Sequence, residues 1–232
     1  MLEIKNLSVN YITDKANICV LDKLSLALPE GSVLGISGTS GMGKTTLLRA
    51  ILGLLPNNAH CDGVIVYNDV SYSLNNEKAD GLLKDLLFVP QHTLDSVSQV
   101  HKIGSMYLDI ALSKGLEHNK KILKARFEAI AEQLAINTKL WDVYPFQLSG
   151  GMLQRVLLTI GLSIGSKIIV LDEPTSALDA ENQDIIISTL KTINSKFSTT
   201  IIIVSHEEDV INSLASYRLT LLKGRYNFEK VN

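Results

Sequence analysis

The chain has 232 residues, with 22 lysine and arginine residues against 24 acidic ones and a formal net charge of -2. This balance argues against a nucleic-acid partner, because proteins that bind nucleic acids usually carry a clear basic excess. The hydrophobic fraction of 46% is ordinary for a globular protein, and the length suffices for one domain or two tightly joined lobes.

The sequence shows no feature of a membrane-spanning or secreted chain. No apolar run approaches the roughly 20 residues that cross a bilayer. The early charges Glu3 and Lys5 are unlike a secretory signal. The two cysteines, Cys19 and Cys61, form no CxxC pair, so neither a disulfide framework nor a zinc site is predicted. We therefore expect a cytoplasmic protein that reaches a membrane only through a partner.

The order of predicted elements indicates an α/β core interrupted by a helical segment. The expected elements of the first part are strands at Leu2–Val9, Cys19–Leu28, Val33–Ser37, Gly63–Tyr67 and Leu86–Val89, and a helix at Lys44–Leu55. From Ile103 to Ile164 the pattern is helical, most regularly over Lys120–Leu134. Strand and helix then alternate over Lys167–Leu171, Glu181–Lys191, Thr199–Val204, Glu207–Leu214 and Arg218–Leu222.

A glycine-rich segment joins a predicted strand to a predicted helix. It fits the pattern G-x-x-x-x-G-K-[ST] over Gly38, Thr39, Ser40, Gly41, Met42, Gly43, Lys44 and Thr45, and we extend the expected ATP site to Thr46. Glycines let successive N–H groups point at a phosphate, and the helix start adds free N–H groups. Lys44 would contact the β- and γ-phosphates, and Thr45 would ligate Mg²⁺. A chance glycine turn is the alternative, which the strand–loop–helix setting disfavours.

Two carboxylates end an apolar strand further along the chain. Asp172 is placed to hold Mg²⁺, directly or through water, and Glu173 to act as general base on the attacking water. Acidic residues commonly open a turn, so this pair gains its weight from the upstream phosphate loop. His206 follows another apolar strand and could contact the γ-phosphate, although a single histidine there is more often a surface residue.

The segment Leu148–Arg155, LSGGMLQR, resembles the signature motif of ABC-transporter ATPases. In that family Ser149, Gly150 and Gly151 would face the γ-phosphate held by the opposite subunit, so that two chains sandwich two ATP molecules. The physical reason is again a helix start that presents N–H groups to an anion. For an isolated Ser-Gly-Gly, a plain N-cap would be the better interpretation.

Further positions resemble the family in order. Gln91 resembles the glutamine that touches Mg²⁺ and water and links the catalytic core to the helical lobe. Ser176–Asp179 resembles a loop that contacts the partner ATPase, and His206 the γ-phosphate histidine. Tyr11 stands where the family places an aromatic residue against adenine, with a plain core position as the alternative. Glu173, His206 and Gln91 are thus the expected catalytic residues.

The resemblance implies an α/β fold, with a P-loop NTPase (RecA-like) core, an antiparallel β subdomain and an inserted α-helical subdomain. We expect one ABC ATPase domain over residues 1–232. Residues 1–91 and 160–232 would form the catalytic core, and residues 92–159 the helical subdomain. The expected metal ligands are Thr45, Gln91 and Asp172, and the expected cofactors are ATP and Mg²⁺.

Two stretches are similar to the importers of oligopeptides, dipeptides and nickel. They are Gln91–Gly104 and Pro145–Arg155, and the first departs from the pattern at His92, Thr93 and Gln99. The resemblance implies two transmembrane permease subunits and a second ATPase, identical or paralogous. It also implies an extracytoplasmic solute-binding protein and a location at the cytoplasmic face of the membrane.

An apolar contact with a permease is expected at Val97, Val100 and Ile103, with a plain helix-start core as the alternative. A soluble ABC protein of DNA repair or of the ribosome is the competing function. The chain has neither the long coiled coils of the first nor the two cassettes of the second. A catalytically inactive regulatory subunit would lack Glu173 or His206, and both are present.

Overall fold

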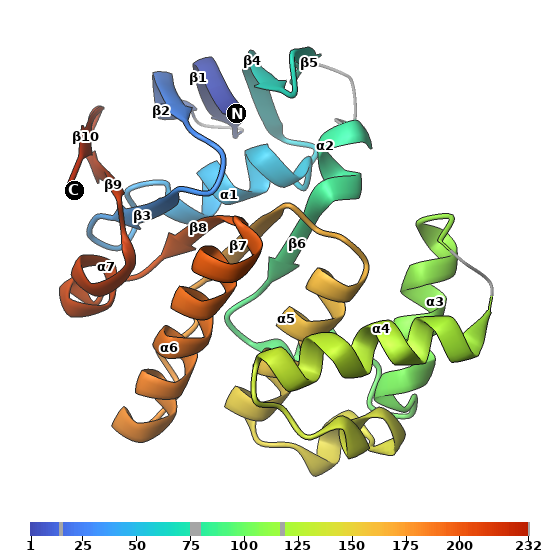
Figure 1. The fold of residues 1–232 in the computed structure, drawn as a ribbon. Coiled ribbons are helices and arrows are strands. Elements are labelled where there is room, and N and C mark those ends of the chain that lie inside the picture. The colour runs from blue at the N-terminus through green and yellow to red at the C-terminus, as the bar shows by residue number, and fades with distance from the viewer. Residues whose placement is uncertain (14–15, 75–79, 117–118, 232) are drawn as a thin grey trace. The chain divides into compact units, whose positions relative to one another are not determined.

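The structure is a computed structural model that describes residues 1–13, 16–74, 80–116 and 119–231 (Figure 1). The chain forms two compact units. Unit 1 consists of Met1–Leu83 and Thr200–Asn232, and unit 2 of Lys84–Thr199. The division falls within a short helix, α2 (Asp80–Asp85), and just before strand β8. The expected domain boundaries at 91 and 160 stay a prediction.

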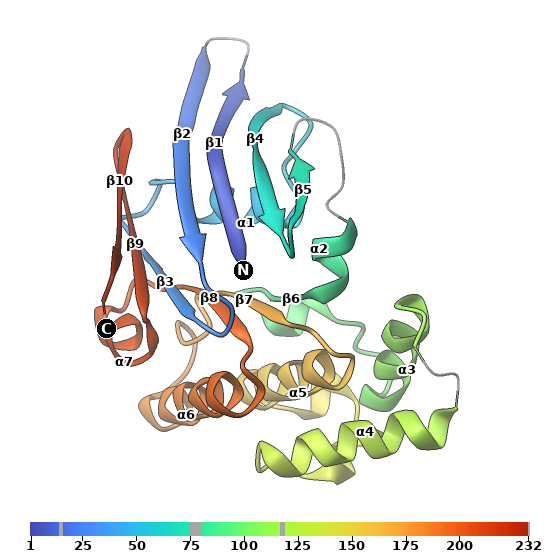
Figure 2. The ribbon, with the colours of Figure 1, turned by 45° about the horizontal axis from the view of Figure 1, so that its top comes forward.

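Unit 1 contains an antiparallel sheet in the order β2-β1-β4-β5 (Figure 2). Its strands are β1 (Leu2–Ile12), β2 (Asn17–Leu28), β4 (Ala59–Tyr67) and β5 (Val70–Ser73). Alternate residues such as Leu7 and Val9 are fully buried, which is the pattern of a sheet with one face on the core. This sheet confirms the antiparallel β subdomain expected from the resemblance.

The same unit contains the strands that position the phosphate loop. They run in the order β10-β9-β3-β8, and β9, β3 and β8 are parallel. The elements are β3 (Val33–Ser37), α1 (Lys44–Leu52), β8 (Thr200–Val204), α7 (Glu208–Leu214), β9 (Tyr217–Leu222) and β10 (Arg225–Lys230). Every residue of β3 and β8 is buried, as expected of parallel strands covered on both faces.

Unit 2 combines a parallel strand pair with helices. The strands are β6 (Leu86–Val89) and β7 (Ile168–Asp172). The helices are α3 (Ile103–Ser113), α4 (Lys120–Gln133), α5 (Gly150–Ser163) and α6 (Ala180–Phe197), with 3-10 turns η1 (Thr93–Ser96), η2 (Thr138–Asp142) and η3 (Pro145–Gln147). Tyr107, Phe127 and Trp141 pack against one another with ring centroids 5.3–5.8 Å apart and hold α3, α4 and η2 together.

Three details differ from the sequence expectations. The first helix ends at Leu52, not Leu55, because Gly53 takes the left-handed conformation and its N–H and that of Leu54 bond back to the last turn. Strand β5 was not expected. It follows a turn in which Asn68 and Asp69 both have positive φ, a conformation typical of tight hairpins. Strand β10, after a second two-residue turn, was also missed.

In the described part of the chain, none of the helices has the length and apolar character needed to cross a membrane.

Candidate active site

The phosphate loop of unit 1 has a backbone that depends on its glycines. Gly38, Gly41 and Gly43 have φ values of 145°, 82° and 95°. At Gly38 a Cβ atom would lie 2.6 Å from the carbonyl oxygen of Leu221 on β9, so a side chain is excluded by contact as well as by φ. The sequence pattern therefore coincides with a loop whose backbone conformation favours glycine at three positions and requires it at Gly38.

Lys44 is the first residue of α1 and turns back across the loop. Its Nζ donates hydrogen bonds to the carbonyl oxygens of Gly38 (2.6 Å) and Thr39 (3.3 Å). The next residue, Thr45, is exposed in the first turn of α1, where backbone N–H groups have no partner within the helix. An ammonium group, the hydroxyl of an exposed threonine and helix-start N–H groups thus lie together, as phosphate binding requires.

Tyr11 reaches the same helix from β1. Its hydroxyl oxygen lies 3.5 Å from the hydroxyl oxygen of Thr46, and its side chain is half-buried, not part of the closed core. The structure thus brings Tyr11 to the loop helix. Its stacking against adenine stays a prediction.

His206 lies at the same edge of the parallel strands as the phosphate loop. Strands β3 and β8 are paired in register, Ile36 beside Val204, and the Ser205 N–H donates to the Ile36 carbonyl (3.2 Å). The carboxyl ends of neighbouring parallel strands are the usual place for a ligand in α/β folds. His206 is exposed there, just after β8.

In unit 2, two predicted catalytic side chains are in direct contact. Val89 pairs with Leu171, so the residues that follow β6 and β7 leave the strands side by side. The Gln91 amide donates hydrogen bonds to the Glu173 carboxylate (2.9 Å) and to the Ser176 hydroxyl (3.3 Å).

Glu173 has an unusual backbone conformation. Its φ is 47°, in the left-handed region that residues other than glycine seldom adopt, and such conformations concentrate at functional sites. The Ser176 hydroxyl donates to the Glu173 carbonyl (3.1 Å) and closes the turn. Asp172, the last residue of β7, is half-buried immediately before it.

The signature segment begins helix α5. Ser149 is its N-cap and accepts a hydrogen bond from the Met152 N–H (3.3 Å). The space beside Gly150 is open. A Cβ atom placed there would have no atom of another described element of unit 2 within 4 Å. The helix start is therefore capped by its own serine and open beside the first glycine.

These unit 2 elements surround one cavity of about 420 Å³. It is lined by residues 91–95, by the start of α5 at 149–151, and by residues within 173–179. Asp179, the N-cap of α6, accepts hydrogen bonds from the Asn182 backbone and then from its side chain, which hold the pKa of Asp179 below its usual range. Gln154 and Asn182 also line the cavity and were missed, although their i+4 and i+3 spacing from Gly150 and Asp179 is a helical signal.

The predicted residues thus form two groups. Unit 1 brings together Tyr11, Thr46 and the phosphate loop, with His206 at the same strand edge. Unit 2 gathers Gln91, Glu173 and the signature glycines around its cavity. A phosphate loop that opens a helix after a parallel strand defines the class: a P-loop nucleotide-hydrolysing protein.

The comparisons with known proteins name the family. Its sequence model, described as "ABC transporter", matches residues 21–176. The chain is 29% identical to the oligopeptide transport ATP-binding protein OppD of Haemophilus influenzae, covering 97% of this chain and 71% of that one. It is 31% identical to the methionine import ATP-binding protein MetN of Histophilus somni, covering 97% and 63%. The chain belongs to the ABC transporter family.

A solved structure agrees on the fold. The dimeric ATP-binding cassette MJ0796, in a post-hydrolysis state bound to ADP and Pi, is 24% identical and gives a TM-score of 0.82, covering 100% of this chain and 99% of that chain. The expected ABC ATPase fold is therefore confirmed. The similarity to OppD confirms the resemblance to peptide-importer ATPases, and family membership makes this chain an ATP-binding, ATP-hydrolysing protein.

Proposed function

We propose that this chain energises an ABC importer for a small solute of the peptide or related type. The Gln91–Glu173 hydrogen bond carries the proposal, because it joins the proposed base to the segment that resembles peptide importers. Relatives named for oligopeptide transport and for methionine import support the direction and the size of the solute. Nickel and metal chelates stay a prediction.

The roles of the site residues follow from their chemistry. Thr45, Gln91 and Asp172 offer a hydroxyl, an amide and a carboxylate, and their oxygens are the ligands that Mg²⁺ prefers alongside nucleotide phosphates. When bound, Mg²⁺ would neutralise charge on the β- and γ-phosphates. Lys44 and the loop N–H groups would hold the phosphates.

Three residues would act on the attacking water and the γ-phosphate. Glu173 would take a proton from the water as general base, and Gln91 would orient that carboxylate through its 2.9 Å hydrogen bond. His206 would contact the γ-phosphate from the end of β8. Tyr11 would stack on adenine beside Thr46.

The signature segment supports a paired assembly. The α5 start at Ser149–Gly151 is open beside Gly150 and suited to an anion, so it would bind the ATP of a second ATPase subunit, a paralogue or an identical chain. The pair would bind two permeases at the cytoplasmic face of the membrane. An extracytoplasmic protein would deliver the solute.

Of the three residues expected to contact a permease, the exposed ones are the better candidates. Ile103 is fully buried, so the prediction that it contacts a permease is wrong and the core alternative applies to it. Val100, by contrast, is 77% exposed just before α3. We assign the apolar contact to Val100, with the half-exposed Val97 beside it.

A charge at Val100 should uncouple transport from ATP hydrolysis. We expect Val100→Glu to lower solute uptake at least about tenfold, because burying even a neutral polar group without a partner costs about 1–3 kcal/mol and a carboxylate costs more. ATP affinity should not change. The matched control is Val70→Glu, which places the same charge on an exposed valine of β5 in unit 1. Normal uptake by the Val100→Glu complex would remove this residue from the permease contact.

Deletion and purification test the transport function itself. Cells that lack this chain should lose uptake of peptides or a related small solute, and permeases should co-purify with the tagged chain from detergent-solubilised membranes. The competing function, a soluble ABC ATPase outside transport, predicts neither result. Normal import together with lost export of another compound would show that the direction is wrong.

A further inference from the structure

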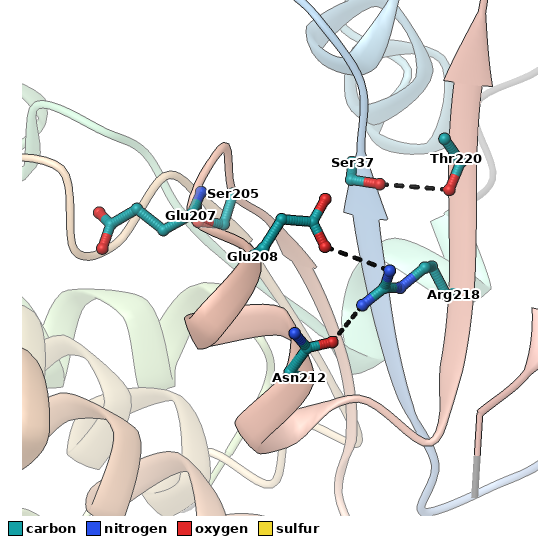
Figure 3. A network of polar contacts seen from close by, with 7 residues as sticks. All are labelled: Ser37, Ser205, Glu207, Glu208, Asn212, Arg218 and Thr220. Carbon is teal, nitrogen blue, oxygen red and sulfur yellow. Dashed lines mark hydrogen bonds and ion pairs between the residues drawn. The ribbon is translucent and has the colours of Figure 1, made fainter.

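A polar network in unit 1 connects strand β9 to helix α7 (Figure 3). The Arg218 Nη1 lies 3.1 Å from the Glu208 carboxylate, and its Nη2 donates a hydrogen bond to the Asn212 side-chain oxygen. Glu208 and Asn212 are four residues apart, so they project from one face of α7. The guanidinium group therefore contacts the helix at two points, one turn apart.

Arg218 makes these contacts from a largely buried position. Its side chain is only 20% exposed, and its Nε is buried without a hydrogen-bond partner among the described residues. The guanidinium is planar, and its two terminal nitrogens donate in a fixed fork. Two contacts from one rigid group restrict the rotation of α7 about its own axis.

A glycine sets the distance between α7 and the sheet. Gly35 of β3 lies beside Arg218 in the sheet register. A Cβ atom at Gly35 would lie 2.6 Å from the Ile211 side chain, so α7 packs directly on the strand backbone. Gly35 thus lets α7 approach the strand closely, and Arg218 adds two polar contacts to the same helix.

His206 lies in the short segment between Ser205, which is bonded to strand β3, and the start of helix α7. Ser205 is held to β3 by its hydrogen bond to Ile36, and its hydroxyl accepts from the Glu207 N–H (3.0 Å). Helix α7 begins two residues after His206, at Glu208. A rotation of α7 would therefore change the orientation of His206.

The same face of β9 also contacts the residue that precedes the phosphate loop. Thr220 is two residues after Arg218, so the two side chains share a face of the strand. Its hydroxyl oxygen lies 3.3 Å from that of Ser37, the residue before Gly38 (Figure 3). One strand thus contacts the phosphate loop at Ser37 and, through α7, the His206 segment.

We propose that Arg218 is a positioning residue that orients His206 toward the γ-phosphate through its two contacts with α7. The inference rests on the proposed role of His206 in ATP hydrolysis. Because Glu208 is 61% exposed, its ion pair adds little to stability, and its loss should change the chemical step more than the folding.

The test compares Arg218→Met and Arg218→Lys with the wild type in the complex purified from membranes through a tag on this chain. For Arg218→Met we expect kcat to fall about tenfold, because small misplacements of a catalytic group cost this much or more. KM for ATP should stay unchanged. Arg218→Lys, which keeps the charge but not the fork, should recover only part of the activity. Arg225→Met removes an exposed guanidinium from the same hairpin and should leave kcat unchanged.

A double variant separates positioning from general damage. Combined with His206→Ala, Arg218→Met should lower kcat no further, since it acts through His206. Additive losses, or a normal kcat for Arg218→Met, would overturn the proposal.

If Arg218→Met fails to fold, Glu208→Gln replaces it in the same experiment. We then expect kcat to fall about threefold, and to fall no further when Glu208→Gln is combined with His206→Ala. An unchanged kcat for Glu208→Gln would overturn the proposal. A wild-type complex without ATPase activity would instead reject the proposed function. An active His206→Ala variant would reject only the proposed role of His206, and either result would overturn this inference.

Discussion

The Glu173→Gln variant is expected to bind ATP as the wild type does and to hydrolyse it at least about tenfold more slowly, since a positioned general base contributes roughly 10²–10⁴-fold. Glutamine keeps the shape of the side chain and loses the carboxylate that accepts the Gln91 hydrogen bond at 2.9 Å. Binding should be spared because no phosphate-loop residue is altered. Calorimetric titration measures the affinity, and phosphate release by the assembled complex measures turnover.

The control for this variant is Glu132→Gln, which makes the same change on the exposed face of α4. It should hydrolyse ATP at the wild-type rate. The Glu173→Gln chain should also pair when ATP is added, with itself or with a sister ATPase, which light scattering can detect. Wild-type turnover by Glu173→Gln would show that another group is the base.

Replacing Lys44 by alanine should lower ATP affinity and hydrolysis together. Hydrogen bonds to charged groups contribute about 1.5–3 kcal/mol, which corresponds to a loss of affinity of roughly 10–100-fold. The Lys44 ammonium lies over the loop, 2.6 Å from the Gly38 carbonyl, and would contact the phosphates before and during reaction. Calorimetry gives the affinity, and circular dichroism checks that the domain remains folded.

Lys121→Ala is the matched control, because it removes an exposed ammonium group from α4. It should leave both quantities unchanged. Unaltered ATP affinity in Lys44→Ala would exclude the proposed contact of Lys44 with the phosphates.

The buried strands of the core could be predicted because their sequences are unambiguous. Ile168–Leu171 and Ile201–Val204 are continuous β-branched or aliphatic runs, as strands covered on both faces require. Strands β5 and β10 could not be recognised in this way. They are short, lie at sheet edges and carry polar residues, so their strand conformation depends on a neighbour and on a turn.

In the candidate site, too, the parts with a local sequence pattern could be predicted and the long-range contacts could not. Local patterns identified the phosphate loop, where glycine spacing directly reflects backbone conformation. The contact between Gln91 and Glu173 spans 82 positions and depends on β6 pairing with β7. Strand order has no local signature, so only the family resemblance pointed to that pair. Arg218 was missed because no local sequence pattern predicts that a basic residue in a strand will contact a helix.

The aromatic packing of Tyr107, Phe127 and Trp141 has a mechanical consequence. Three interlocked rings resist bending, so a push on the chain near Val100 should displace the helices as one stiff body. The α3 start is tied to the segment before α5, because the Ile103 N–H donates to the Val143 carbonyl (2.9 Å). These contacts give a continuous route along which a movement at the proposed permease contact could be passed toward the signature glycines.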